Sequence, residues 1–361
     1  MVNGCFRVAW TVRLRNGAWI MQNYCEVKLF TKNSLYLQRT GNFKSSQLMN
    51  RVFCDDLLQR QFETDGYVVV PQFLNAAEVQ NLLTAYHKPD GNINGKFHRT
   101  LQFQSVAYKK DLSIAVKELV TPKALNLLQD YRYLLSSFMV KEPEADNAFE
   151  LHQNWNFVEE DKYHSVVFWV PLVDTDAKNG AMYVVKGSNR LLPTYRGGPN
   201  IPSVFEAVIP YIKEHYLTII PLKAGDAIIF DDALLHYTSS NQSSNTRYAI
   251  AQVMIPRVAR PIHYYQSAEN TGKKIEVFEI DDDFYLYYYN RYPLGDYPAD
   301  CRQIGTIPCS SKPLTINQFE SLYHKTALTP EKQRSVSVTD VKRFFVKVGQ
   351  KIGNAIFNSA H

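Results

Sequence analysis

Long apolar runs are absent from this chain: no stretch reaches the roughly 18 consecutive apolar residues that a membrane-spanning helix needs. The first 30 residues also lack a continuous apolar core that ends in small residues, so we expect no secretory signal. Cysteine is scarce, and none of the cysteines has the spacing of a zinc site. We therefore expect a cytoplasmic protein in which all five cysteines are reduced thiols: Cys5, Cys25, Cys54, Cys301 and Cys309.

A large excess of positive or negative charge is absent as well. The chain has 40 Lys and Arg residues against 35 Asp and Glu, a net charge of +5 over 361 residues. The basic residues are spread along the sequence and do not gather in one patch interleaved with aromatic residues. Such a patch is the usual footprint of a phosphate backbone, so nucleic acid is not an expected partner.

A small set of polar residues is the most informative feature that is present. His152 is followed two residues later by Asn154, a second histidine stands at His236, and Arg247 comes after it. Two imidazoles and a third oxygen ligand on one face of a metal are the arrangement of non-haem Fe(II) oxygenases. That arrangement calls for Asp or Glu where this chain has Asn154, whose amide oxygen is neutral and a weaker donor to a hard cation.

The pattern of apolar residues predicts the surrounding elements. Strand-like runs cover residues 150–157, 165–172, 181–185, 225–231 and 248–255, with a further strand that carries His236. Helix-compatible stretches lie ahead of these strands, at residues 76–87, 111–119 and 123–135. Parallel alternation of strands and helices is absent, so the layout predicts an α+β fold rather than a doubly wound sheet.

From about Phe62 to Pro256 the chain resembles the phytanoyl-CoA dioxygenase family of Fe(II)/2-oxoglutarate oxygenases. Residues 62–71 resemble the opening strand of that family, and residues 75–79 resemble the start of its first helix. The remaining landmarks fall in the family's order at compatible spacings: His152, Trp169, Asn179-Gly180, Gly187-Ser188, Gly225-Asp226, Phe230, His236, Thr238 and Arg247. The resemblance implies a double-stranded β-helix, a barrel of two antiparallel sheets flanked by helices.

The resemblance also assigns roles to residues. His152, Asn154 and His236 become the metal ligands, and Arg247, Thr238 and Trp169 become the residues around 2-oxoglutarate. Arg247 stands 247 − 236 = 11 residues after His236. Its planar, permanently charged fork suits the outer carboxylate of 2-oxoglutarate. The implied activity is hydroxylation of a small-molecule substrate with release of succinate and carbon dioxide.

Asn154 leaves several hypotheses open. The chain is a slow but working oxygenase, a family member that binds ligand without turnover, or a sequence with an engineered change at this position. A halogenase is a further alternative, because halogenating relatives lack the acid; they have a small residue there, whereas an asparagine side chain would fill much of the space. A second departure is Asn189, where the family usually has histidine after Gly-Ser. We expect Asn154→Asp to increase the affinity for Fe(II), because it restores an anionic ligand.

Three regions are predicted along the chain. Residues 1–58 form an accessory or poorly ordered extension, residues 59–260 the oxygenase domain, and residues 261–361 a C-terminal segment on the core. In the C-terminal segment, the aromatic residues at 284–292 are expected to pack on the core, with a wall of the substrate pocket as the alternative. Residues 341–356 have the spacing of a basic amphipathic helix, which docks on its own domain or binds a partner or membrane surface.

Overall fold

The computed structural model describes residues 11–13, 19–21, 51–86, 97–292, 295–309 and 312–327. The chain divides into two units, residues 1–45 and 46–361. In the first unit, β1 (Thr11–Arg13) pairs antiparallel with β2 (Trp19–Met21). All other elements of the described residues belong to the second unit.

Three helices precede most of the strands of the second unit: α2 (Asp56–Asp65), α3 (Ala76–Ala85) and α4 (Val106–Leu127). The predicted helix start at residue 76 is confirmed, because Asn75 and Glu78 form a capping box there. Two other predictions are wrong. Residues 62–65 are the last turn of α2, so the opening strand β3 is only Tyr67–Val70. The helix predicted at 123–135 ends at residue 127, and β5 (Tyr131–Lys141) follows.

Two antiparallel sheets form the centre of this unit. The six-stranded sheet has the order β3, β10 (Ala227–Asp231), β7 (Val166–Pro171), β12 (Arg247–Pro256), β5 and β4 (Phe97–Arg99). The four-stranded sheet has the order β6 (Phe149–His152), β11 (His236–Thr238), β8 (Met182–Val184) and β9 (Thr218–Ile220). The α+β double-stranded β-helix is thereby confirmed. The strand predicted at 150–157 is shorter than expected, because β6 ends at residue 152.

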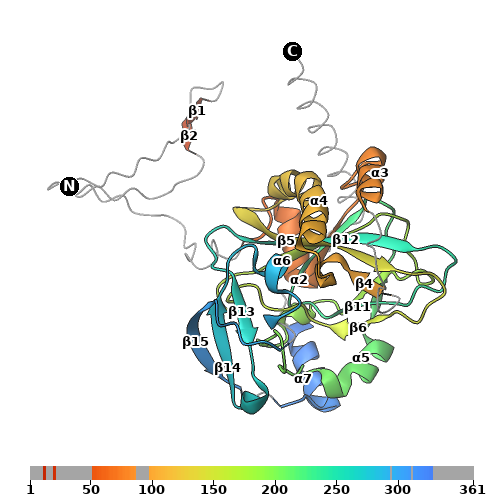
Figure 1. The fold of residues 1–361 in the computed structure, drawn as a ribbon. Coiled ribbons are helices and arrows are strands. Elements are labelled where there is room, and N and C mark those ends of the chain that lie inside the picture. The colour runs from red at the N-terminus through yellow and green to blue at the C-terminus, as the bar shows by residue number, and fades with distance from the viewer. Residues whose placement is uncertain are drawn as a thin grey trace. The chain divides into compact units, whose positions relative to one another are not determined.

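Strand β7 explains how the six-stranded sheet separates two layers. All six of its residues are buried, and successive side chains point to opposite faces. Phe168 belongs to the core that includes Val116 and Val120 of α4, whereas Val167 and Trp169 belong to the core between the two sheets. Helices therefore cover one face of the sheet, and Figure 1 shows α4 lying over β5 and β12. The opposite face is free to line an interior site.

The outer face of the four-stranded sheet packs on α5 (Ile209–His215) and α7 (Ile316–Ala327), through Leu151, Val185 and Leu235. A third sheet follows the barrel in sequence and consists of β13 (Ile262–Tyr265), β14 (Lys274–Glu279) and β15 (Arg302–Pro308). The aromatic segment contains α6 (Phe284–Tyr288), and four of its rings are buried in the core between the sheets: Phe284, Tyr285, Tyr289 and Tyr292. The helix predicted at 341–356 lies outside the described residues.

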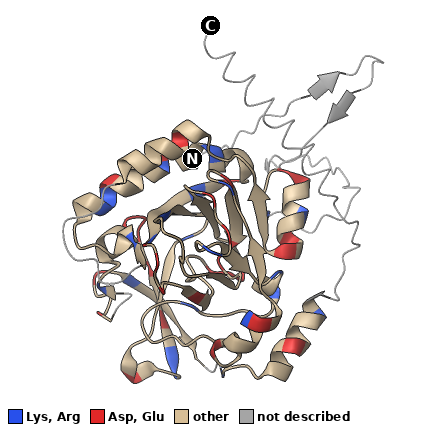
Figure 2. Ribbon diagram, turned by 90° about the vertical axis from the view of Figure 1, so that its right-hand side faces the viewer, with Lys and Arg blue, Asp and Glu red and all other residues tan. Residues whose placement is uncertain are grey.

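Acidic and basic residues are interspersed along the helices and strands in the view of Figure 2. No helix in the described part of the chain is long and apolar enough to cross a membrane. Cys54, Cys301 and Cys309 are free thiols. The cytoplasmic location stays a prediction.

Candidate functional site

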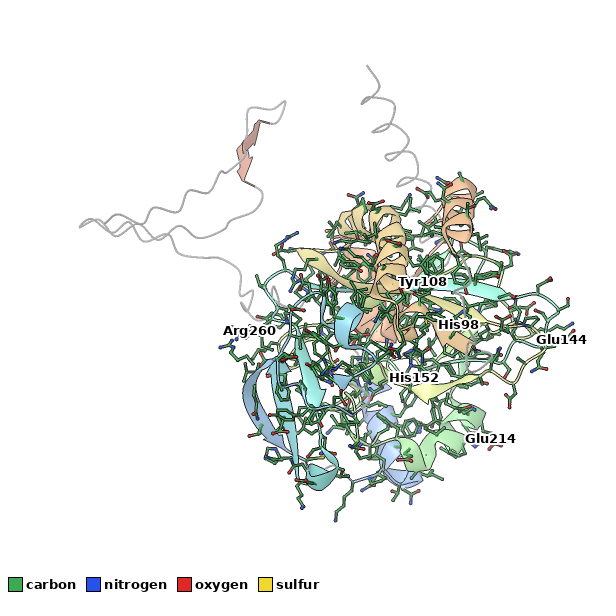
Figure 3. All side chains as sticks on the ribbon, viewed as in Figure 1. His98, Tyr108, Glu144, His152, Glu214 and Arg260 are labelled. Atoms are coloured by element: carbon green, nitrogen blue, oxygen red, sulfur yellow. The ribbon has the colours of Figure 1, made fainter. Side chains whose placement is uncertain are left out.

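The two predicted histidines are direct partners on neighbouring strands. His152 ends β6, His236 begins β11, and the two residues face each other in the antiparallel register. Their ring centroids are 4.2 Å apart, although 84 positions separate them in the sequence. Figure 3 shows His152 in the interior of the unit, whereas Glu214 and Arg260 lie at its periphery. The register of β6 against β11 therefore creates the histidine pair.

Both imidazoles are held in the form that binds a metal. The Nδ1 atom of His152 lies 2.7 Å from the carbonyl oxygen of Glu150, and that of His236 lies 2.8 Å from the carbonyl oxygen of Leu234. A carbonyl oxygen only accepts, so each Nδ1 carries the proton and each Nε2 keeps its lone pair. The Nε2 atom of His152 is buried and has no hydrogen-bond partner. Metal-ligating histidines use the same backbone contact to fix their orientation.

Burial keeps both rings neutral. The pKa of His152 is held well below its ordinary value by burial, and the neighbouring His236 and Arg99 lower it further. Burial lowers the pKa of His236 to about 4. A neutral ring with a free Nε2 is the ligating species.

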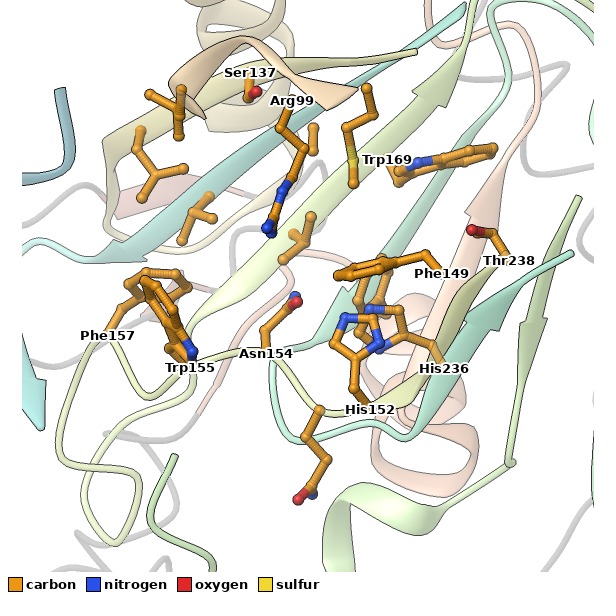
Figure 4. Close-up of a pocket in the computed structure, with 18 of the residues that line it drawn as sticks. Arg99, Ser137, Phe149, His152, Asn154, Trp155, Phe157, Trp169, His236 and Thr238 are labelled. Carbon is orange, nitrogen blue, oxygen red and sulfur yellow. The ribbon is translucent and has the colours of Figure 1, made fainter. Parts of the chain in front are cut away.

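Asn154 lies just beyond the end of β6, yet its position is fixed. Its backbone N–H donates to the carbonyl oxygen of Asp232 at 2.9 Å, and its own carbonyl oxygen accepts from Nε of Arg196 at 2.5 Å. Its side-chain Nδ2 donates to Oδ1 of Asp232 at 2.9 Å. A carboxylate oxygen accepts this bond, so the amide nitrogen must face Asp232, and the amide oxygen is the atom left for the cavity. Figure 4 shows the Asn154 side chain entering the cavity beside His152.

Asp232 is the acid that contacts Asn154, and no motif singles it out beyond its place in the Asp231-Asp232 pair ahead of His236. It is fully buried. Burial raises the pKa of its carboxyl to about 7, while the hydrogen bond from Asn154 acts in the opposite direction. Within the described residues, no group of three or more His, Cys, Asp and Glu is placed to hold a metal ion. Two imidazoles and one side-chain amide thus line this part of the cavity.

Arg247 is a buried cation at the start of β12, and only 1% of its surface is exposed. Its Nη1 donates to the carbonyl oxygen of Met139 at 2.9 Å, and its guanidinium carbon lies 5.5 Å from the centroid of the Trp169 ring. Its Nε has no hydrogen-bond partner, and no described carboxylate forms a salt bridge with it. Burial lowers the pKa of Arg247 to about 9. A guanidinium buried without an anion costs free energy until an anionic ligand arrives.

Lys141 lies opposite Arg247 in the register of β5 and β12, and no sequence motif indicates its role. It is fully buried, and its Nζ donates to the carbonyl oxygens of Thr238 at 3.0 Å and Ser239 at 2.6 Å. Burial, and then the charge of Arg247, lower the pKa of Lys141 to about 6. The lysine therefore fixes the strand end that carries Thr238 beside Arg247.

All six residues predicted for the site line one cavity of about 240 Å³: His152, Asn154, Trp169, His236, Thr238 and Arg247. The predicted strands thus bring the whole set together. The opposite wall is aromatic and comes partly from the C-terminal segment: Trp155, Phe157, Tyr285 and Tyr289. Packing and pocket lining were alternatives for the aromatic segment, and Tyr285 and Tyr289 do both.

The donor set fits a divalent metal with the co-substrate beside it. The histidine pair offers nitrogen lone pairs, Asn154 offers a neutral oxygen, and the buried guanidinium of Arg247 lines the same cavity. These are features of an oxygenase-type double-stranded β-helix, with an amide at the position where that arrangement has an acid.

Comparison with known proteins agrees with this class. The model of the phytanoyl-CoA dioxygenase (PhyH) family matches residues 62–249, which is 249 − 62 + 1 = 188 of the 361 residues. The chain therefore belongs to the phytanoyl-CoA dioxygenase family, whose members use Fe(II) and 2-oxoglutarate. The resemblance inferred from the sequence is confirmed.

Individual relatives are more distant. A phytanoyl-CoA dioxygenase of Arabidopsis thaliana is 28% identical over 116 residues, which are 32% of this chain and 41% of that protein. The chain thus spans less than half the length of this relative. Among solved structures, the carbocyclase SnoK from nogalamycin biosynthesis is 16% identical, with a TM-score of 0.45 over 61% of this chain and 90% of that one. HygX from Streptomyces hygroscopicus, with nickel and 2-oxoglutarate bound, is 18% identical, with a TM-score of 0.42 over 56% and 88%.

Proposed function

We propose that this protein is an Fe(II)/2-oxoglutarate-dependent dioxygenase that hydroxylates a small molecule. The overall reaction balances as R–H, 2-oxoglutarate and O₂ giving R–OH, succinate and carbon dioxide. The observation that carries the proposal is the pairing, within one cavity, of two neutral imidazoles and a buried guanidinium that has no anion. Bound Fe(II) would supply the activation of O₂.

The protein's own residues would perform the remaining tasks. His152, His236 and Asn154 would hold the metal, and the backbone contacts of both Nδ1 atoms would keep the rings oriented without help from the metal. Arg247 would bind the outer carboxylate of 2-oxoglutarate, and Trp169 would keep the guanidinium in place. Thr238 lies close by on β11. The aromatic wall would exclude water from the reacting atoms.

The test is substrate-independent. Many oxygenases of this type decarboxylate 2-oxoglutarate slowly without substrate, so succinate formed by the purified protein under air, with Fe(II) and ascorbate, is the direct readout. We expect slow succinate release that His236→Ala abolishes and that Arg260→Gln, a surface control, leaves unchanged. The absence of succinate at saturating Fe(II) would contradict the proposal.

One observation favours a second candidate function. Asn154 is locked by Asp232 and brings no negative charge, so the metal would be held less tightly than by the usual acid. A protein of this fold that binds 2-oxoglutarate through Arg247 without turnover would show calorimetric binding of 2-oxoglutarate but no succinate. The two measurements together separate an oxygenase from a ligand-binding protein.

A further inference from the structure

The cavity continues from the candidate metal site along the six-stranded sheet. Its lining includes Arg247, Ala251 and Val253 of β12, and alternate side chains of a strand face the same side of the sheet. From Arg247 to Val253 is 253 − 247 = 6 residues, a span of about 20 Å at ~3.3 Å per residue. The cavity therefore has two ends, one at Arg247 and the other at Val253.

The end at Val253 is formed by apolar side chains. In the register of the sheet, Val253 lies between Leu135 of β5 and Val167 of β7. Figure 4 shows Phe157 on the opposite side of the cavity from Trp169 and Thr238. Six lining residues make up what we call the apolar end: Leu101, Leu135, Phe157, Val167, Val253 and Tyr285. All of them except Leu135, which is half-buried, are buried, so this end is shielded from solvent.

The only hydroxyl of the apolar end is turned toward a partner in the protein. The hydroxyl of Tyr285 lies 3.5 Å from Nδ1 of the buried His263, and Nε2 of His263 lies 3.0 Å from the carbonyl oxygen of Gly198. A carbonyl oxygen only accepts, so Nε2 carries the proton and Nδ1 accepts from Tyr285. Tyr285 therefore presents its ring, and not its hydroxyl, to a ligand.

Ser137 is the polar residue next to the apolar end, because it lies opposite Ala251 in the register of β5 and β12. Its Oγ donates to the carbonyl oxygen of Phe138 at 2.9 Å and lies 3.2 Å from Oγ1 of Thr100. The single hydrogen of this hydroxyl is thus engaged within the protein.

The positive charges of the lining belong to the other end. Arg247 starts β12, and the guanidinium of Arg99 lies over the ring of Phe149, whose centroid is 4.2 Å from that of the His152 ring. None of the six residues of the apolar end is ionised at neutral pH, since burial raises the pKa of Tyr285 well above its ordinary value. A charged or polar group placed there would lose its hydration without gaining a partner, whereas an apolar group is stabilised by burial.

We propose that the apolar end is a substrate subsite that takes an uncharged ring or short alkyl group, and that Val253 sets how long this group can be. The inference rests on the proposed function, because it takes the end at Arg247 to be occupied by 2-oxoglutarate. The substrate is then a small molecule with an apolar tip. Tyr285 lies beyond the family match at 62–249, so part of the subsite comes from outside the matched region.

The test is a series of primary alcohols of increasing length, from 1-propanol to 1-octanol. The full chain is titrated by calorimetry, in the presence of 2-oxoglutarate and without added metal. Each further methylene group that enters the apolar end should increase the affinity about fourfold, and the increase should stop at the length that fills the cavity. An α,ω-diol of the same length should bind at least about tenfold more weakly, because its second hydroxyl would be buried without a partner.

Two substitutions at Val253 should move this length limit in opposite directions. Val253→Ala lengthens the cavity and should shift the limit to a longer alcohol, whereas Val253→Leu should shift it to a shorter one. Val170→Ala is the matched control, because Val170 is also buried in the six-stranded sheet but belongs to the core on the helix side. It removes the same atoms and should leave the limit unchanged.

The outcomes separate this inference from the proposed function. A limit that stays the same in the Val253 variants, or that moves as much in Val170→Ala, would overturn the inference, as would an unaltered chain that binds none of the alcohols. A diol that binds as tightly as the alcohol would overturn the apolar character of the subsite. Binding with the expected limit, in a chain that forms no succinate, would support the subsite and contradict only the oxygenase activity. Urea unfolding shows which variants are folded, and either Val253 variant alone decides the result.

Discussion

The side chain of Asn154 donates a hydrogen bond to the buried carboxylate of Asp232, over 2.9 Å. An amide at position 154 therefore has a structural partner that an acid at this position would not have. An aspartate there would place two carboxyl groups against each other in a buried setting, where both cannot be ionised and one must hold a proton. The change from acid to amide and the presence of Asp232 are coupled.

This coupling predicts different outcomes for a single and a double substitution. Asn154→Asp alone should destabilise the fold at neutral pH by about 1–3 kcal/mol, because one of the two buried carboxyl groups must then be protonated. The pair Asn154→Asp with Asp232→Asn restores the hydrogen bond with donor and acceptor exchanged, and it should recover most of that stability. The double variant should also bind Fe(II) more tightly than the unaltered chain. Urea unfolding and anaerobic Fe(II) titration measure the two effects.

A double variant that is no more stable than the single one would show that residue 232 does not contact residue 154. A double variant that is stable but binds Fe(II) no better would show that the side chain at 154 does not face the metal.

Arg247→Lys should weaken the binding of 2-oxoglutarate by about 1–3 kcal/mol, because a bidentate contact becomes a point contact. The adjacent Lys141 cannot replace the fork, since its Nζ already donates to two carbonyl oxygens and its pKa is lowered to about 6. Calorimetry with 2-oxoglutarate measures the loss, with Arg260→Lys as the surface control. Unchanged affinity would leave Arg247 only a structural role.

Gly225 is predicted to tolerate no side chain. Its φ is +86°, and a Cβ atom there would lie 2.3 Å from the carbonyl oxygen of Leu74. Gly272 also has a positive φ, of +71°, but nothing lies within 4 Å of its Cβ position. Gly225→Ala should therefore destabilise the protein by clearly more than the ~1 kcal/mol expected from backbone strain alone in Gly272→Ala. Equal losses in urea unfolding would mean that the contact between residues 225 and 74 is not tight.

The sequence predicted those parts of the fold that local patterns encode. The apolar run at residues 165–172 predicted a strand, and residues 75–79 resembled the start of a helix; both agree with the structure. The helix predicted at 123–135 failed for the opposite reason. Tyr131–Lys141 is a strand because it pairs along its length with β12, and that partner lies more than 100 residues away. Long-range pairing outweighed local propensity there.

The residues of the candidate site likewise fall into those that the sequence predicted and those that only the folded structure reveals. The six predicted residues were found because a family resemblance carries their order and spacing, and the structure gathers them in one cavity. Arg99, Lys141 and Asp232 stand in no motif. Arg99 and Lys141 reach the cavity through the register of β5 with β4 and β12, and Asp232 reaches Asn154 from a position 78 residues away in the sequence. Contacts of this kind depend on the folded sheet, so a single sequence does not reveal them.

The central claim, that His152, His236 and Arg247 together hold a metal and 2-oxoglutarate, is tested most directly by an anaerobic titration. Fe(II) is added to saturation, 2-oxoglutarate follows, and the visible absorption spectrum is recorded for the unaltered chain, for His236→Ala and for the Asn154→Asp, Asp232→Asn pair. The account predicts the weak charge-transfer band of the 2-oxoglutarate chelate in the unaltered chain, a band at lower Fe(II) concentration in the double variant, and none in His236→Ala. A spectrum without the band in both the unaltered chain and the double variant would contradict it.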